Sequence, residues 1–246
     1  MAILCIGDSL TYGRVGYSYI DRLKTNQPVI NAGKNGDTLH RMTQRLRRIL
    51  DGCAAETIDT CVVGIGTNDL LLPYLCTLSP LWAMQFAPRC RRMQCITDDK
   101  EFAFAYEQML EYLKRRQLHV ILIGIPYLQL EHFPHDKICR YNQIIRSLAH
   151  RYGCGFVDLY GMQLHLAPSP CSFSWQHRNL PRMLDSAGMT LFPPIKAHLE
   201  RTRQLGLSVD GVHYNRRSAA ALAAAVDLLL DKSSCFGSSC GYGFRT

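Results

Sequence analysis

Residues 2–13 read AILCIGDSLTYG, an apolar run that ends at a glycine and is followed by polar residues. Such a run of apolar residues predicts a short buried β-strand over residues 2–6. Gly7 then allows the backbone to turn, so Ser9 comes directly after the carboxyl end of this strand. In an open α/β sheet, ligands bind in the crevice outside these strand ends. A serine at this position can act as a nucleophile if a histidine and an oxyanion-binding site lie beside it.

Apolar runs of strand length alternate with helical patterns along the rest of the chain. Strands are predicted over residues 2–6, 29–33, 58–65, 118–125 and 155–159, and helices over residues 16–25, 38–50, 99–117, 141–152 and 216–231. Alternation of this kind is typical of a parallel sheet with helices on both faces. We therefore expect a three-layer α/β/α fold with a flavodoxin-like, five-stranded parallel sheet, and we assume the strand order 2-1-3-4-5.

The chain is predicted to form one main domain over residues 1–232. Its 246 residues are 47% hydrophobic, which suits a single globular core. Two proline-containing segments, 70–98 and 160–208, are expected to be irregular insertions that form substrate-pocket walls or a lid. Residues 233–246 are rich in glycine, serine and cysteine and are predicted to be a flexible tail.

The formal net charge of +8 comes mainly from clusters of basic residues within 41–48, 89–92 and 114–116. Solvated helix faces are the simpler interpretation of these clusters. No sequence pattern of a nucleic-acid-binding module accompanies them, so we expect no nucleic-acid partner. A non-catalytic module that binds nucleic acid or another anion is the alternative from a different functional class.

The cysteine and histidine patterns do not favour a metal site. Cys90 and Cys95 could be combined with Cys235 and Cys240, but neither pair has the C-x₂-C spacing typical of zinc. The sequence EHFPHD at residues 131–136 contains metal-ligating residue types, and a surface loop is its simpler interpretation. We expect no metal and no organic cofactor.

Segments that would direct the chain to a membrane are not apparent in the sequence. No run of 18 apolar residues is present, so no transmembrane segment is expected. The first residues lack the basic and apolar regions of a signal peptide. We therefore expect a cytoplasmic protein, or a mature form from which a targeting segment has been removed.

Four short blocks of polar residues follow the predicted strands or precede the last helix. They read GDSL at residues 7–10, NAGKNGDT at 31–38, GTND at 66–69 and DGVH at 210–213. In this order and at these positions they resemble the GDSL or SGNH hydrolase family of esterases and lipases. The frame of strands and helices that joins the blocks extends over roughly residues 2–231.

The resemblance implies a serine hydrolase mechanism. Ser9 would attack an ester carbonyl after its proton passes to His213, and Asp210 would orient the imidazole. The backbone N–H groups of Ser9 and Gly36 and the side-chain amide of Asn68 would form the oxyanion hole. A second hydrolase motif, G-x-S-x-G at residues 237–241, lacks the strand before it, the helix after it and a following histidine, so we interpret it as accidental.

We therefore expect a serine esterase that acts through an acyl-enzyme on a small-molecule, carbohydrate or lipid ester. Our first expectation is a carbohydrate O-acetylesterase or another small-acyl esterase. A lysophospholipase, a thioesterase and an acyltransferase of the same fold are the alternatives, because a fold does not determine a substrate. The oligomeric state cannot be predicted from the sequence.

Overall fold

The computed structural model describes residues 1–52, 57–167, 171–176 and 178–237, with only the backbone for residues 179, 180 and 232–237. Its centre is a parallel sheet formed by five strands: β1 (Ala2–Gly7), β2 (Val29–Gly33), β3 (Ile58–Gly64), β4 (His119–Ile123) and β5 (Gly155–Val157). The strand order is β2-β1-β3-β4-β5, which confirms the predicted flavodoxin-like topology.

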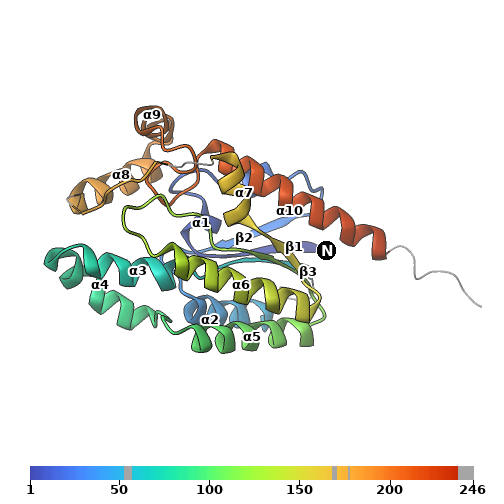
Figure 1. Cartoon of the computed structure of the whole chain (residues 1–246). Helices are drawn as coiled ribbons and strands as arrows, with labels where there is room; N and C mark the ends of the chain where they lie inside the picture. Colours follow the sequence, from blue (N-terminus) through green and yellow to red (C-terminus); the bar gives the residue numbers. More distant parts are fainter. Residues whose placement is uncertain (53–56, 168–170, 177, 238–246) are drawn as a thin grey trace, which may run out of the picture.

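Helices cover both faces of this sheet and make the three predicted layers (Figure 1). The helices are α1 (Ser9–Tyr12), η1 (Ile20–Arg22), α2 (Leu39–Leu50), α3 (Thr67–Leu78), α4 (Pro80–Met93), α5 (Asp99–Arg115), α6 (His135–Tyr152), α7 (Leu159–Leu166), α8 (Asn179–Leu191), α9 (Pro194–Arg203) and α10 (Arg216–Gly237). Helices α2, α5 and α6 lie on one face, and α7 and α10 on the other, while α3, α4 and α8 gather near the carboxyl ends of the strands.

The central strand β1 is buried along its whole length, as its apolar sequence predicts. A glycine is required at its end, because a Cβ atom at Gly7 would lie 2.2 Å from the carbonyl oxygen of Gly64 on β3. On α2, the side chains of Leu39, Met42 and Leu46 are fully buried, as the helical spacing of apolar residues predicts. The end of β1 is therefore packed closely against β3.

The predicted helix over residues 16–25 is wrong, since this segment contains only the single 3₁₀ turn η1. Gly16 has a φ of +70°, which interrupts a right-handed helix. The N–H of Tyr17 donates to the carbonyl of Tyr214, and the N–H of Lys24 donates to the carboxylate of Asp227. Tertiary hydrogen bonds therefore replace the helical ones that the pattern suggested.

The two segments predicted to be irregular are instead largely helical. Segment 70–98 contains most of α3 and all of α4, and segment 160–208 contains most of α7 and all of α8 and α9. Their prolines misled the prediction. Pro80 and Pro194 occupy first-turn positions, where a missing N–H costs no helical hydrogen bond, and Pro73 and Pro88 lie inside α3 and α4, which continue past them.

The last helix is longer than predicted, because α10 continues from residue 231 to Gly237. The rest of the predicted tail, residues 238–246, lies outside the described part of the chain, as does most of the G-x-S-x-G match. Among the described residues, no helix has both the length and the apolar character needed to cross a membrane.

Candidate active site

Ser9, His213 and Asp210 meet at the carboxyl end of β1. The Oγ atom of Ser9 lies 3.1 Å from Nε2 of His213, and Nδ1 of the same ring lies 2.7 Å from Oδ2 of Asp210. A carboxylate only accepts hydrogen bonds, so its partner Nδ1 carries a proton. In a neutral ring, Nε2 is then free to accept the Ser9 hydroxyl. These contacts join three side chains that the sequence separates by up to 204 residues.

The carboxyl group of Asp210 is held in its charged form although it is buried. Burial raises its pKa, but the charge of His213 and hydrogen bonds from that residue and from Val212 outweigh this effect and bring the pKa to about 2. The backbone N–H groups of Val212 and His213 donate to Oδ1 at 3.0 and 2.8 Å. One oxygen of Asp210 thus fixes the loop, and the other faces the imidazole.

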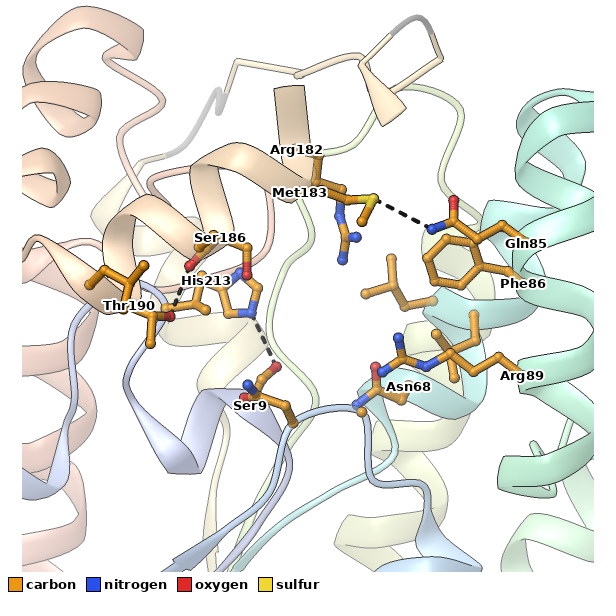
Figure 2. Close-up of a pocket in the computed structure, with 17 residues that line it drawn as sticks. Ser9, Asn68, Gln85, Phe86, Arg89, Arg182, Met183, Ser186, Thr190 and His213 are labelled. Carbon is orange, nitrogen blue, oxygen red and sulfur yellow. Dashed lines mark hydrogen bonds between the residues drawn. The ribbon is translucent and has the colours of Figure 1, made fainter. Parts of the chain in front are cut away.

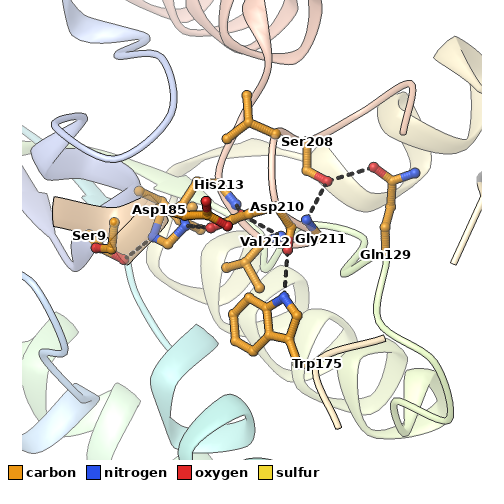
Figure 3. A network of polar contacts seen from close by, with 12 residues as sticks. Ser9, Gln129, Trp175, Asp185, Ser208, Asp210, Gly211, Val212 and His213 are labelled. Atoms are coloured by element: carbon orange, nitrogen blue, oxygen red, sulfur yellow. Dashed lines mark hydrogen bonds and ion pairs between the residues drawn. The ribbon is translucent and has the colours of Figure 1, made fainter. Parts of the chain in front are cut away.

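The loop that carries Asp210 and His213 is braced by residues that sequence reasoning missed (Figure 3). Ser208 Oγ donates to Gln129 Oε1 at 2.7 Å and accepts from the N–H of Gly211 at 3.0 Å. The indole N–H of Trp175 donates to the carbonyl of Asp210 at 2.7 Å. Gln129 and Trp175 are far from the loop in sequence, so only the tertiary structure reveals these contacts.

Gly36 and Asn68 line the same cavity as Ser9, as expected for neighbouring strand ends, and Figure 2 shows Ser9 and Asn68 on the side of the cavity away from α8. Gly36 has a φ of +78°, a conformation that side chains rarely adopt. The side-chain amide of Asn68 donates to the carbonyl of Asp37 at 2.9 Å. An amide group has two hydrogens, so this bond orients Asn68 and leaves a second donor for a ligand.

The side chains of Arg45 and Asp69 fix the loops that hold Gly36 and Asn68. Arg45 forms an ion pair with Asp37 at 2.7 Å and also donates to the carbonyl of Gly7 at 3.2 Å. Asp69 accepts from the N–H groups of Leu39 and Ile96 at 2.9 and 3.0 Å. Arg45 therefore has a structural role, although the charge pattern predicted a solvated arginine.

A cavity of about 450 Å³ opens above Ser9 and His213 (Figure 2). Its wall contains residues of both long segments: Leu71, Leu72, Gln85, Phe86 and Arg89 from α3 and α4, and Arg182, Met183, Ser186, Ala187, Thr190 and Leu191 from α8. The site therefore combines a serine hydroxyl, a histidine ring and hydrogen-bond donors with space for a small molecule.

Residue types that suggested a metal site have other partners. The His135 ring stacks on Tyr127 with centroids 4.2 Å apart, and Asp136 pairs with Arg140 at 2.7 Å. No group of three or more histidine, cysteine, aspartate or glutamate side chains could hold a metal ion in the part of the chain that the structure describes. The thiols of Cys235 and Cys240, which were considered with the Cys90 pair, lie outside the described side chains.

Asp8, the neighbour of Ser9, carries a buried carboxyl group whose ionisation opposes folding. Its Oδ1 accepts from the N–H of Leu10 at 2.9 Å, but its buried Oδ2 has no hydrogen-bond partner among the described residues. Burial raises the pKa of Asp8 to about 7. In an unfolded chain the value is about 3.9. The folded state therefore retains a proton that the unfolded state loses, and stability falls as the pH rises from about 4 to about 7.

We expect Asp8→Asn to reduce this pH dependence, because asparagine has a similar shape and no charge to lose. The wild-type protein should lose more than about 1 kcal/mol of unfolding free energy between pH 5 and 8 through Asp8, since one pKa unit corresponds to about 1.4 kcal/mol. Urea unfolding at both pH values measures the difference. The exposed Asp136→Asn serves as a control and should retain the wild-type fall. An equal fall in Asp8→Asn would contradict the assignment.

Comparisons with known proteins agree with this fold. The model of the GDSL-like Lipase/Acylhydrolase family matches residues 5–221. No curated protein matches the sequence. Among solved structures, a lipase/acylhydrolase from Enterococcus faecalis is 19% identical with a TM-score of 0.60, and the match covers 94% of this chain and 96% of that one.

Two further solved structures have the same fold at similarly low identity. The acetyl xylan esterase AlAXEase is 19% identical with a TM-score of 0.56, covering 94% of this chain and 100% of its own. AlinE4, an SGNH-hydrolase family esterase, is 21% identical with a TM-score of 0.50, covering 94% of this chain and 95% of its own. At these identities the matches show a shared fold and do not identify a substrate.

Proposed function

Because the chain belongs to the GDSL-like Lipase/Acylhydrolase family, we propose that it hydrolyses carboxylic esters with Ser9 as the nucleophile. The observation that carries this proposal is the line of contacts from Ser9 Oγ to His213 and from His213 to Asp210, at 3.1 and 2.7 Å. This geometry supports transfer of the hydroxyl proton to Nε2.

In the proposed mechanism, Ser9 Oγ attacks the ester carbonyl as His213 Nε2 takes its proton. The oxyanion of the tetrahedral intermediate accepts hydrogen bonds from the N–H groups of Ser9 and Gly36 and from the Asn68 amide. The C–O bond to the alcohol then breaks, and His213 returns the proton to that oxygen. Water, deprotonated by His213, hydrolyses the acyl-enzyme and restores Ser9.

The cavity supports a small acyl group on a polar alcohol, such as a carbohydrate acetate. Apolar side chains line both walls, with Leu71, Leu72 and Phe86 on one and Met183, Ala187 and Leu191 on the other. On this second wall, the hydroxyl group of Ser186 can hydrogen-bond a polyhydroxy substrate. The hydroxyl group of Thr190 donates to the carbonyl of Ser186 at 2.8 Å and can accept from the substrate. A cavity of about 450 Å³ that must also hold the alcohol has room for only a small acyl group, which favours a small-acyl esterase over a hydrolase for long acyl chains.

We expect kcat/KM for para-nitrophenyl esters to be highest for acetate or propionate and to fall at least tenfold by octanoate. The physical reason is that the cavity of about 450 Å³ must hold the alcohol as well as the acyl group, which leaves little room for a long chain. A series of esters that differ only in acyl length measures this preference. An increase with chain length would instead support a lysophospholipase or thioesterase, and transfer to an added alcohol would support an acyltransferase.

A further inference from the structure

Two arginine side chains reach into the cavity from opposite walls. Arg182 extends from α8 and Arg89 from α4, and Figure 2 shows both guanidinium groups directed into the space above Ser9 and Asn68. Neither residue belongs to the four sequence blocks that predict the ester chemistry. The mechanism proposed above gives neither of them a role.

Neither guanidinium group has a carboxylate partner among the described residues. Other described arginines do, including Arg45 with Asp37 and Arg203 with Asp185. The Nε atoms of both Arg89 and Arg182 are buried and have no hydrogen-bond partner in the described structure. An unpaired buried charge is costly, and a bound anion would remove much of that cost.

Aromatic rings hold these guanidinium groups without using their N–H edges. The Arg182 guanidinium lies 4.3 Å from the ring centroid of Trp175, and that of Arg89 lies 5.8 Å from Phe86. Cation–π contacts of this kind help to hold each guanidinium group in place. The N–H donors remain available for two-point bonds to a carboxylate or phosphate group.

The electrostatics and the position of the pair both suit an anion beside the reacting ester. Burial lowers the pKa of both groups, and for Arg182 the attraction of Asp210 acts in the opposite direction while the charge of Arg89 lowers the pKa further. The Arg89 head lies against Gly36, because a Cβ atom on that glycine would be 2.2 Å from Arg89 Nη2. A bound anion would therefore lie close to the proposed oxyanion hole.

We propose that the substrate is an ester that bears a carboxylate or phosphate group near its scissile bond, and that Arg89 and Arg182 bind this group. The inference rests on the proposed ester hydrolysis and narrows its substrate class. The two guanidinium groups exchange no proton and form no covalent bond in the reaction. They are specificity determinants that place the ester carbonyl over Ser9.

The test compares aryl acetates that differ in charge: para-acetoxybenzoate, para-acetoxyphenyl phosphate and the neutral methyl para-acetoxybenzoate. Hydrolysis is measured for the wild type, Arg89→Met and Arg182→Met. Methionine keeps an unbranched chain without the charge. Arg91→Met is the matched control, because Arg91 is an exposed residue of the same helix α4 as Arg89. Arg89→Lys and Arg182→Lys test whether a positive charge alone restores the preference for the anionic esters.

We expect the wild type to prefer an anionic ester over the neutral one by at least tenfold in kcat/KM. Each methionine variant should lower this preference about 10- to 100-fold, mainly through KM, as loss of charge-assisted hydrogen bonds does. Lysine should restore part of the preference, and Arg91→Met should retain all of it. The anion that shows the larger preference distinguishes carboxylate from phosphate.

If the wild type and both methionine variants show the same preference for the anionic over the neutral ester, the anion proposal is overturned and the proposal of ester hydrolysis still stands. A separate binding measurement keeps the two proposals distinguishable. Calorimetric titration of Ser9→Ala with para-acetoxybenzoate and with para-acetoxyphenyl phosphate should show binding of at least one of them, and Arg182→Met in the same background should weaken that binding at least tenfold. If the wild type hydrolyses none of the esters yet this binding is found, the hydrolase proposal fails and the anion site stands. No binding of either anion would overturn the site itself.

Discussion

Ser9→Ala is expected to reduce kcat for ester hydrolysis by about 10⁴- to 10⁶-fold, the range seen when a serine hydrolase loses its nucleophile. The substitution removes the Oγ atom that lies 3.1 Å from His213 Nε2. Without it no acyl-enzyme can form, and only the slow attack of water on a bound ester remains. Since Ser9 is only half-buried at the start of α1, the fold should tolerate the change.

The measurement is steady-state hydrolysis of para-nitrophenyl acetate, together with labelling by a fluorophosphonate, which reacts with activated serines. Ser147→Ala is the matched control, because Ser147 is an exposed residue of α6, away from the cavity. The control and the wild type should hydrolyse the ester and take up the label, and Ser9→Ala should do neither. Activity of Ser9→Ala within tenfold of the wild type would refute Ser9 as the nucleophile.

The sequence predicted the sheet because its strands are short apolar runs that need no long-range information. The run before Gly7 gave β1, and similar runs gave the other strands at nearly their observed bounds. The helices of the two long segments were missed for a local reason. Prolines such as Pro80 were interpreted as breaks, although a proline in the first turn of a helix is well tolerated.

Part of the candidate site was also predictable, because Ser9, Gly36 and Asn68 each follow a strand whose carboxyl end faces the same crevice. The supporting residues carried no comparable signal. Trp175 contacts Asp210 from a segment 35 residues away. Gln129 braces the same loop from the segment after β4. Such contacts depend on tertiary packing, which composition and spacing do not encode.

The orientation of Arg89 and Arg182 was beyond the sequence for a related reason. Both lie in segments where arginines are frequent, and charge alone does not distinguish a solvated side chain from one that faces a cavity. The structure makes the distinction through burial. Their Nε atoms are buried, whereas Arg91, two residues from Arg89, is exposed.

Asp210→Asn is expected to lower kcat about 10⁴-fold, the loss seen when asparagine replaces the aspartate of a serine protease triad. The asparagine oxygen can still accept from the N–H groups of Val212 and His213, so the loop should keep its shape. Its NH₂ group would then face Nδ1 of His213. That contact favours the tautomer with the proton on Nε2, which cannot accept the proton of Ser9.

Activity on an aryl acetate at pH 7 measures this loss, and urea unfolding at the same pH shows whether the fold is retained. Asp136→Asn is the control for removal of a carboxylate, since it pairs with Arg140 on the surface of α6. Because the pKa of Asp210 is about 2, its carboxylate stays charged throughout the usual assay range, and its loss cannot be mimicked by a modest fall in pH. A folded Asp210→Asn variant with near wild-type activity would show that His213 is oriented by other contacts, and the triad assignment would then fail even if Ser9 were the nucleophile.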